Sequence, residues 1–176
     1  MIVRVATRAD LPRLANLIAR SARALCARDY TEEQIEGALT GALGVDSQLI
    51  EDQTYFVVEE KGGLAACGGW SFRKTLFGSD SEGGRDVERL EPPLDAAKIR
   101  AFFVDPAHAR QGLGRLLLER CETEAAARGF TGFELMATLS GERLYRRCGY
   151  RAAPTIAYNL GNGLTIDFVP MSKSAG

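Results

Sequence analysis

The chain has 176 residues, of which 45% are hydrophobic and 26% charged, with 22 Lys and Arg against 23 Asp and Glu. This composition excludes disordered, fibrous and membrane-embedded proteins, and the length suits one hydrophobic core, so we expect a single domain over residues 1–176. The near-zero net charge gives no broad attraction to nucleic acid or to anionic membranes. We therefore expect neither as a partner, and any anion site has to be local.

The sequence carries no pattern that indicates export or a metal centre. Residues 1–4 lead straight into an alternating segment without a charged-then-apolar leader, and no apolar run approaches the roughly 20 residues of a membrane span. The four cysteines are scattered without a CxxC pair, and His108 is the only histidine. We therefore expect a cytoplasmic protein with reduced cysteines and no metal cofactor.

The N-terminal segment predicts a strand followed by two helices. Apolar residues at 2–5 indicate a short strand, and leucines and isoleucines at helical spacing predict a helix over 11–25 that Thr7 or Asp10 can cap. A Thr-Glu-Glu-Gln capping box opens a second, shorter helix over 31–39. Two helices are therefore expected before the main sheet.

A hairpin and then an irregular segment follow. Strand-like residues at 55–59 and 64–71 flank a Lys-Gly-Gly turn and predict an antiparallel hairpin. Periodicity is lost over 74–97, and a segment of this length is usually functional or disordered. Within it, residues 80–95 carry six acidic residues against two arginines, which either draw a cationic ligand to a site or form a solvated loop.

The second half of the chain alternates strands and helices, as expected for a mixed α/β (α+β) domain without internal repeats. Glycines end both of its helices, and another glycine turn separates its last two strands. In chain order we expect a strand at 99–104, a helix from 113 to near 129, a strand at 133–138, a helix at 142–148, and a hairpin of 155–160 and 164–169.

The loop between the strand at 99–104 and the next helix has the pattern of a phosphate-binding site. Gly112 and Gly114 allow the backbone to approach a bulky anion, and the N–H groups of the helix's first turn are left without helical acceptors. Arg110 and Arg115 add positive charge at the same place. The alternative interpretation is a tight turn before an amphipathic helix.

Two nucleotide-binding classes fit this loop poorly. The sequence has no GxxxxGK[ST] motif, which disfavours a P-loop nucleotidase. Leu117 stands where a dinucleotide-binding fingerprint needs its third glycine. A pyrophosphate carried by some other cofactor is therefore favoured over ATP or NAD.

At this loop the sequence resembles the GNAT superfamily of N-acetyltransferases. The family has a strand ending in Val-x-Pro, followed by [RQ]-x-x-G-x-[GA] at a helix N-terminus, and here 104–106 and 109–114 match, except that Ala109 replaces the usual Arg or Gln. A second family motif, Leu-Tyr-x-x-x-Gly-[FY], is matched by 144–150. Thr138 stands where many members carry an asparagine. The resemblance covers nearly the whole chain.

The resemblance implies a fold, a cofactor and its contacts. The implied fold is a mixed, mostly antiparallel sheet of about seven strands with about four helices, in which the central strands splay apart. Acetyl-CoA is the implied cosubstrate, and its pantetheine arm pairs with the backbone near Phe103 and Val104 as an added strand would. The residues implied to hold its pyrophosphate are Arg110, Gln111, Gly112, Leu113, Gly114 and Arg115.

The resemblance also implies direct attack of an amine on the thioester. Tyr145 matches the family position that protonates the leaving thiolate, although its ring could instead pack against the cofactor. A backbone N–H near Val104 is the implied oxyanion donor. The general base is left open, because the strand at 99–104 has no acidic residue; Glu134, Tyr30 and a water chain remain, and His108 is expected on the surface.

The acceptor cannot be chosen from the sequence, beyond a small-molecule or peptide amine. Trp70 and Phe72 lie on a strand beside the expected acceptor cleft, where core packing is the default for a tryptophan. Two alternatives differ from an acetyltransferase: a non-catalytic acyl-CoA-binding module of the same fold, and a transferase for a longer acyl chain. Whether the protein forms a homodimer, and whether segment 74–97 lines the site, are also left open.

Overall fold

The computed structural model describes residues 1–75, 80 and 88–176. Its helices and strands follow the predicted order, and the Thr31 capping box is confirmed, with the Gln34 N–H donating to Thr31 Oγ1 at 3.2 Å. The helices are α1 (Leu11–Leu25), α2 (Glu32–Leu39), α3 (Ser47–Glu51), α4 (Leu113–Ala127) and α5 (Glu142–Arg147). The strands are β1 (Ile2–Val5), β2 (Tyr55–Glu60), β3 (Gly63–Ser71), β4 (Ala97–Val104), β5 (Gly132–Thr138), β6 (Arg151–Ala152), β7 (Ile156–Gly161) and β8 (Leu164–Ser174).

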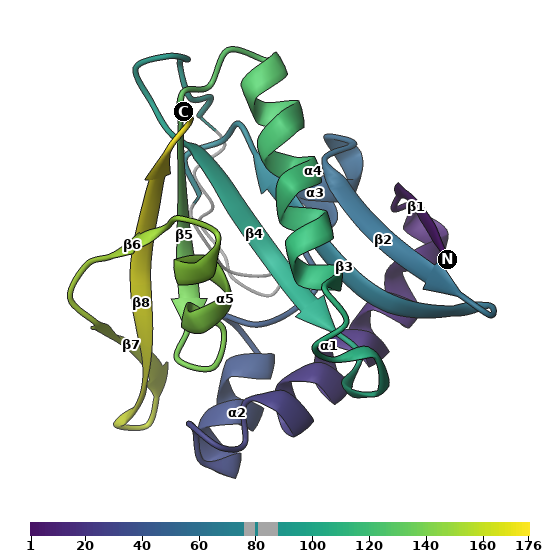
Figure 1. Cartoon of the computed structure of the whole chain (residues 1–176). Helices are drawn as coiled ribbons and strands as arrows, with labels where there is room; N and C mark the ends of the chain where they lie inside the picture. The colour runs from purple at the N-terminus through teal and green to yellow at the C-terminus, as the bar shows by residue number, and fades with distance from the viewer. Residues whose placement is uncertain (76–79, 81–87) are drawn as a thin grey trace.

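The strands form one mixed, mostly antiparallel sheet in the order β1-β2-β3-β4-β5-β8-β6, and β7 also pairs with β8 (Figure 1). In the described part of the chain it has eight strands, one more than the approximate expectation, and there are five α-helices where about four were expected. The additions are α3, with five residues, and β6, with two. Elements this short carry no readable periodicity, which is why the sequence did not predict them.

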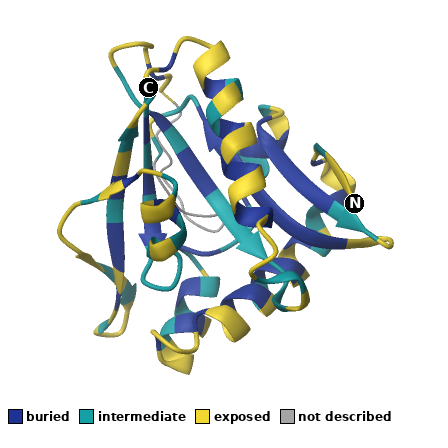
Figure 2. Ribbon diagram, viewed as in Figure 1, coloured by how far each residue is buried: buried dark blue, intermediate teal, exposed yellow. Residues whose placement is uncertain are grey.

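Helices cover both faces of the sheet, and three apolar clusters fill the space between. One cluster packs α4 and α5 against the central strands, and the other two lie under α1 with α3 and under α2 with β8. Figure 2 shows β3 almost wholly buried, as its continuous apolar run requires, whereas the second half of β4 is only partly buried. In the described residues no helix is both long and apolar enough to cross a membrane.

The two central strands separate partway along their length. β4 and β5 are parallel and pair only from Ala97 opposite Phe133 to Ile99 opposite Leu135. Beyond Ile99 the strands diverge, as Figure 1 shows toward the lower half of the view. The splayed central strands implied by the resemblance are therefore present, and β4 keeps an edge without a neighbouring strand.

A bulge in β4 lies at the point of separation. Ala101 has a φ of 55°, and the register with β3 shifts between Cys67 and Gly69. The Tyr55 hydroxyl donates to the Ala101 carbonyl at 3.2 Å, so a buried phenol satisfies a carbonyl that the bulge removes from the ladder. Gly68 lies beneath, where an added Cβ would be 2.8 Å from the Phe102 ring.

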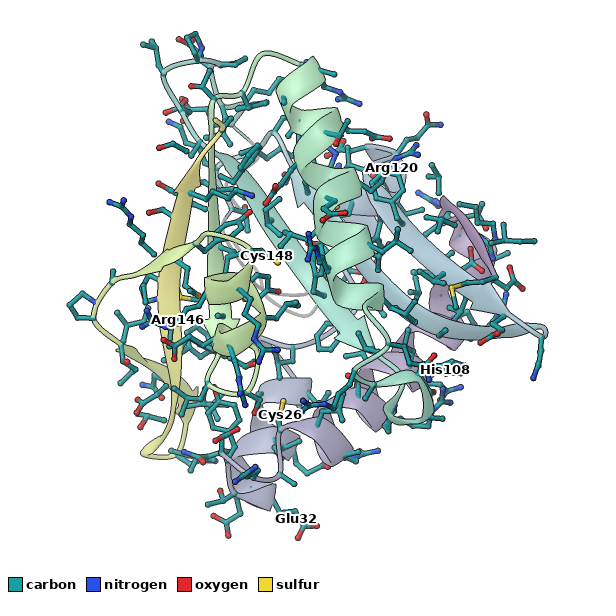
Figure 3. All side chains as sticks on the ribbon, viewed as in Figure 1. Cys26, Glu32, His108, Arg120, Arg146 and Cys148 are labelled. Carbon is teal, nitrogen blue, oxygen red and sulfur yellow. The ribbon has the colours of Figure 1, made fainter. Side chains whose placement is uncertain are left out.

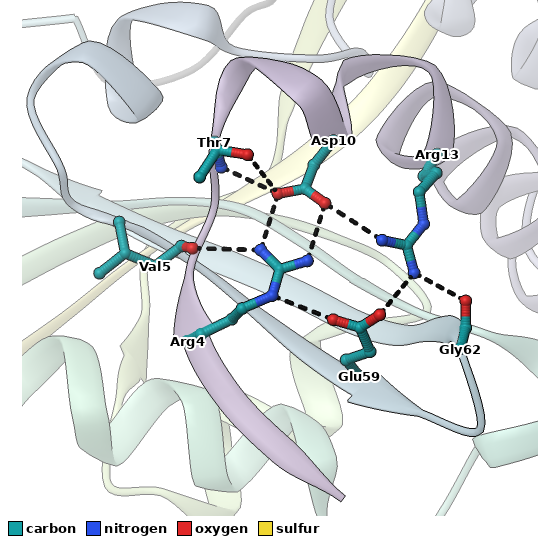
Figure 4. A network of polar contacts seen from close by, with 7 residues as sticks. All are labelled: Arg4, Val5, Thr7, Asp10, Arg13, Glu59 and Gly62. Atoms are coloured by element: carbon teal, nitrogen blue, oxygen red, sulfur yellow. Dashed lines mark hydrogen bonds and ion pairs between the residues drawn. The ribbon is translucent and has the colours of Figure 1, made fainter.

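An ion-pair network fixes the start of α1 to the first two strands (Figure 4). Asp10 is 3% exposed and accepts bonds from Arg4 at 2.7 and 2.8 Å, while Glu59 accepts from Arg4 and from Arg13 at 3.0 Å. The hydrogen bonds from Arg4 lower the pKa of Asp10 well below its usual range, although burial acts against them. The carboxylate therefore contributes stability above its unfolded pKa, and that stability is lost as the pH falls through the lower folded pKa.

Candidate active site

A cavity of about 690 Å³ lies where β4 and β5 separate. This volume is typical of a pocket that buries a drug-sized ligand or part of a cofactor. Its walls come from the facing segments of β4 and β5, the end of α1, the start of α4 and one side of α5. Cys26 after α1 and Cys148 after α5 also line it (Figure 3). The splay of the sheet thus produces a site that elements from both faces enclose.

The start of α4 presents backbone N–H groups to this cavity. Gly112 precedes the helix with a φ of 85°, and Arg110 also has a left-handed φ, of 64°. Leu116 donates the first N–H of the helical ladder, to the Gly112 carbonyl at 2.9 Å. The N–H groups of residues 113–115 therefore have no acceptor within the helix, and the positive end of its dipole faces the cavity. This arrangement matches the predicted anion site.

The two glycines of the loop do different things. A Cβ on Gly112 would meet nothing within 4 Å, so that residue is open to a ligand and is constrained only by its positive φ. Gly114 is buried, and a Cβ there would lie 2.9 Å from the Leu144 side chain. The sequence assigned Gly114 to anion approach alone; the structure adds close packing of α4 against α5.

The cavity is lined by arginines and, in the part of the chain that the structure describes, by no carboxylate. Arg110 and Arg115 were predicted here, and Arg143 and Arg147 join them from α5. The sequence did not single out Arg143 and Arg147, because basic residues spaced four apart on a short helix usually lie on its solvent-exposed face. Of these four arginines, Arg115 also bonds to Glu119 outside the lining at 2.7 Å. Arg146, labelled in Figure 3, is bonded to Glu142 at 2.7 Å and does not line the cavity. The site therefore suits a ligand with several phosphate charges.

Most of the predicted site residues meet at this cavity. Those that line it are Phe103, Val104, Arg110, Gly112, Leu113, Gly114, Arg115 and Tyr145. Gln111 does not line it; its side-chain amide donates to the Ala107 carbonyl at 3.4 Å, so its contact with a cofactor stays a prediction. Thr138 lines it, but its hydroxyl already accepts the Gly141 N–H at 3.0 Å and closes a turn.

The end of β4 has one edge bonded and one edge open. Asp105 donates its N–H to the Ala65 carbonyl at 2.8 Å, and alternate residues of a strand point their backbone groups the same way. Val104 is therefore turned away from β3, and its N–H donates to the Ser21 hydroxyl of α1 at 3.3 Å. Ser21, which the sequence did not single out, also lines the cavity.

Tyr145 lies under the cavity with only 8% of its surface exposed. Its ring makes edge contacts with Phe102 at 6.3 Å and Tyr150 at 5.8 Å between centroids. Burial, and then the neighbouring cysteines, raise its pKa, so the phenol is protonated at neutral pH. Its hydroxyl has no hydrogen-bond partner among the described residues, and it is thus available to a ligand.

The residues considered as general bases lie elsewhere. The Tyr30 hydroxyl donates to the Asp167 carbonyl at 2.6 Å and accepts the Leu139 N–H at 2.8 Å, so its bonding capacity is used within the fold. Glu134 pairs with Lys98, and His108 pairs with Glu60 at 3.0 Å. Neither of the two candidate residues, Tyr30 and Glu134, lines the cavity, and His108 does not line it either. Among the described residues the cavity lining therefore holds no carboxylate, and the general base stays open.

Two further predictions concerned the acceptor side of the site: the role of Trp70 and that of the acidic segment 80–95. Trp70 is fully buried in the core beneath α4, with Phe130 at 6.0 Å between ring centroids, which confirms core packing as its role. Of the acidic segment 80–95, residues 81–87 fall outside the described residues, and none of its described residues lines the cavity. Of that segment, Asp80 accepts the Ser47 N–H at 2.9 Å at the start of α3.

Comparison with known proteins assigns the family. The acetyltransferase (GNAT) domain family matches residues 51–152, more than half of the chain, and the protein belongs to that family. No curated protein matches the chain.

Solved structures share the fold. A GCN5-related N-acetyltransferase from Rhodopseudomonas palustris is 20% identical, with a TM-score of 0.72, 98% of this chain covered and 94% of that one. PaiA N-acetyltransferase from Thermoplasma acidophilum, in complex with coenzyme A, is 15% identical with a TM-score of 0.66 and 98% of both chains covered. A ribosomal-protein-alanine N-acetyltransferase from Brucella melitensis is 20% identical with a TM-score of 0.64 and 99% of both covered.

Replacing Gly112 tests whether this cavity binds CoA. Gly112→Asp should abolish CoA binding, because it places a carboxylate where phosphate is expected to meet the α4 N-terminus. Gly112→Asn is the matched control, since both residues tolerate a left-handed backbone but only one is charged. We expect the Asn variant to lose no more than about tenfold in affinity, or about 1.4 kcal/mol, in calorimetric titration. A folded Asp variant with wild-type affinity would show that the loop is only a turn.

Proposed function

We propose that the protein transfers an acetyl group from acetyl-CoA to a primary amine. The observation that carries the proposal is the meeting, in one cavity, of the α4 N-terminus, a set of arginines and the open edge of β4. A phosphate-rich cofactor with an amide-bearing arm complements all three. Membership of the GNAT family and the similar structure in complex with coenzyme A support the same assignment.

Different elements around the cavity would bind different parts of the cofactor. The first-turn N–H groups of α4 and the arginines of its loop bind the pyrophosphate, and Arg143 and Arg147 bind further phosphate oxygens. The edge of β4 near Val104 binds and orients the pantetheine arm. When bound, acetyl-CoA supplies an acetyl thioester. The amine nitrogen forms a bond to the acetyl carbon, the carbon–sulfur bond breaks, and the thiolate leaves.

Tyr145 provides a proton or a hydrogen bond to the leaving sulfur. Because burial raises its pKa, it enters the reaction as a phenol, and it can recover any proton it gives from the solvent. The amine must lose one proton before attack and a second after it. Since no carboxylate lines the described part of the cavity, we propose that water takes both.

The acceptor enters on the side of the cavity formed by the end of α1 and by β5 and β8. Apolar and weakly polar residues, Cys26, Leu43, Met136 and Phe168, line that side, together with Arg100. Arg100 is 5% exposed and pairs with buried Asp46 at 2.6 Å, so its charge is already compensated. We propose a small-molecule or peptide amine with an apolar part next to its amino group.

Incubation with acetyl-CoA and a panel of amines tests the function. The panel should contain amino acids, polyamines, aminoglycosides and peptides with different N-termini, and both free thiol and product mass should be measured. We expect equal amounts of thiol and acetylated product, at a rate that rises with pH toward the pKa of the amine because no carboxylate lines the described part of the cavity. Thiol release without an acetylated amine would contradict transfer and favour an acyl-CoA-binding module.

Tyr145→Phe tests the role of the phenol. Single-turnover transfer should slow by about a hundredfold, while acetyl-CoA affinity stays nearly unchanged, because the ring is kept and only the proton donor is lost. Tyr150→Phe is the matched control, since that hydroxyl bonds to Glu122 at 2.9 Å and does not line the cavity. A wild-type single-turnover rate in Tyr145→Phe would leave Tyr145 with a packing role only.

A further inference from the structure

We propose that Ser21 is a catalytic residue that donates a hydrogen bond to the thioester carbonyl oxygen, beside the N–H of Val104. This role rests on the proposed function and adds a side chain of α1 to it. A backbone amide near Val104 is the donor that the family resemblance implies. The second donor would be Ser21, which lies 83 residues before Val104 in the sequence.

The contacts of Ser21 leave its hydroxyl proton available. Ser21 is 5% exposed, lines the cavity and accepts the Val104 N–H at 3.3 Å. Within the described residues its hydroxyl makes no other hydrogen bond. A hydroxyl has one proton to donate besides its acceptor sites, so Ser21 holds a buried, unused donor directed at the reaction cavity.

The position of Ser21 is set by the packing of α1. Leu17, Ile18 and Ala22 around it are buried in the core. The preceding residue, Arg20, forms an ion pair with Asp105, which directly follows Val104. Partial burial acts to raise the pKa of Asp105, but the hydrogen bond from Arg20 helps to hold it below its usual value. Two consecutive residues of α1 thus contact two consecutive residues at the end of β4.

The geometry allows one oxygen to contact both donors. The N–O distance of 3.3 Å is longer than the usual 2.9–3.0 Å, so the Val104 N–H is weakly held and can share its proton with a second acceptor on the cavity side. A carbonyl oxygen that accepts this N–H lies within reach of the Ser21 hydroxyl, which rotates about its χ1 bond and donates its proton. Preorganised donors of this kind act on the negative charge that develops on the oxygen as the amine attacks.

The opposing interpretation is that Ser21 only satisfies a buried amide. The two interpretations differ in what Ser21→Ala does. If Ser21 is a donor, the thioester carbonyl loses a hydrogen bond. If it only accepts, its removal frees the Val104 N–H for the carbonyl, and the carbonyl keeps or strengthens its hydrogen bonding.

Difference infrared spectroscopy of carbonyl-¹³C acetyl-CoA bound to the protein separates them, and it needs no acceptor. Hydrogen bonding lowers a carbonyl stretching frequency, so we expect Ser21→Ala to raise it relative to wild type, with an unchanged dissociation constant. Ser21→Thr should restore the wild-type frequency, because it keeps the hydroxyl. Ser140→Ala is the matched control, since Ser140 lines the same cavity but donates to Asp29 at 2.7 Å.

With an acceptor from the amine panel, Ser21→Ala should slow single-turnover transfer by roughly ten- to a hundredfold, below the largest losses seen for oxyanion donors. If Ser21→Ala folds poorly, Ser21→Cys keeps the size while replacing the hydroxyl with a weak donor, and the frequency should again rise. An unchanged or lower frequency in these variants would overturn the donor role. Failure of the wild-type protein to bind acetyl-CoA would instead overturn the proposed function itself.

Discussion

The site depends on one constraint: β4 must stay paired with β3 on both sides of its bulge while it leaves β5 after Ile99. A regular strand twisting away would expose unpaired backbone groups in the core, at a cost of a few kcal/mol each. The bulge at Ala101 resolves the conflict by taking up the change of direction, and the buried Tyr55 hydroxyl satisfies the carbonyl that the bulge displaces. The backbone groups that remain unpaired lie at the cavity, where a ligand can bond to them.

The charges around this opening suit an anionic ligand. Arginines from the α4 loop and from α5 line the cavity together with a helix N-terminus, and no carboxylate lies in the described lining. Only Arg115 among them bonds to a carboxylate that the structure gives, Glu119 at 2.7 Å outside the lining. Positive groups gathered in a cavity repel one another, so an anionic ligand gains affinity by relieving that repulsion as well as by direct bonding. The same described lining holds no carboxylate that could act as a general base, which is why we propose solvent as the proton acceptor.

Local sequence patterns predicted the parts of the site that lie on one stretch of chain. Gly112 and Arg110 could be placed because a strand, a glycine loop and a helix follow one another directly. Contacts made by tertiary packing were not predictable. Ser21 meets Val104 across 83 positions, and Gly114 needs the position of Leu144 to explain its lack of a side chain. Ser21 stands among the apolar residues of α1, and its sequence neighbours do not indicate which element packs against it.

A crystal structure with acetyl-CoA bound tests the account most directly. We predict that the pantetheine arm lies between β4 and β5 beyond Ile99, with the pyrophosphate on the N–H groups of residues 113–115. The thioester oxygen should lie within hydrogen-bonding distance of the Val104 nitrogen and the Ser21 hydroxyl. A cofactor bound elsewhere on the protein, or bound here with the α4 N-terminus empty, would contradict it.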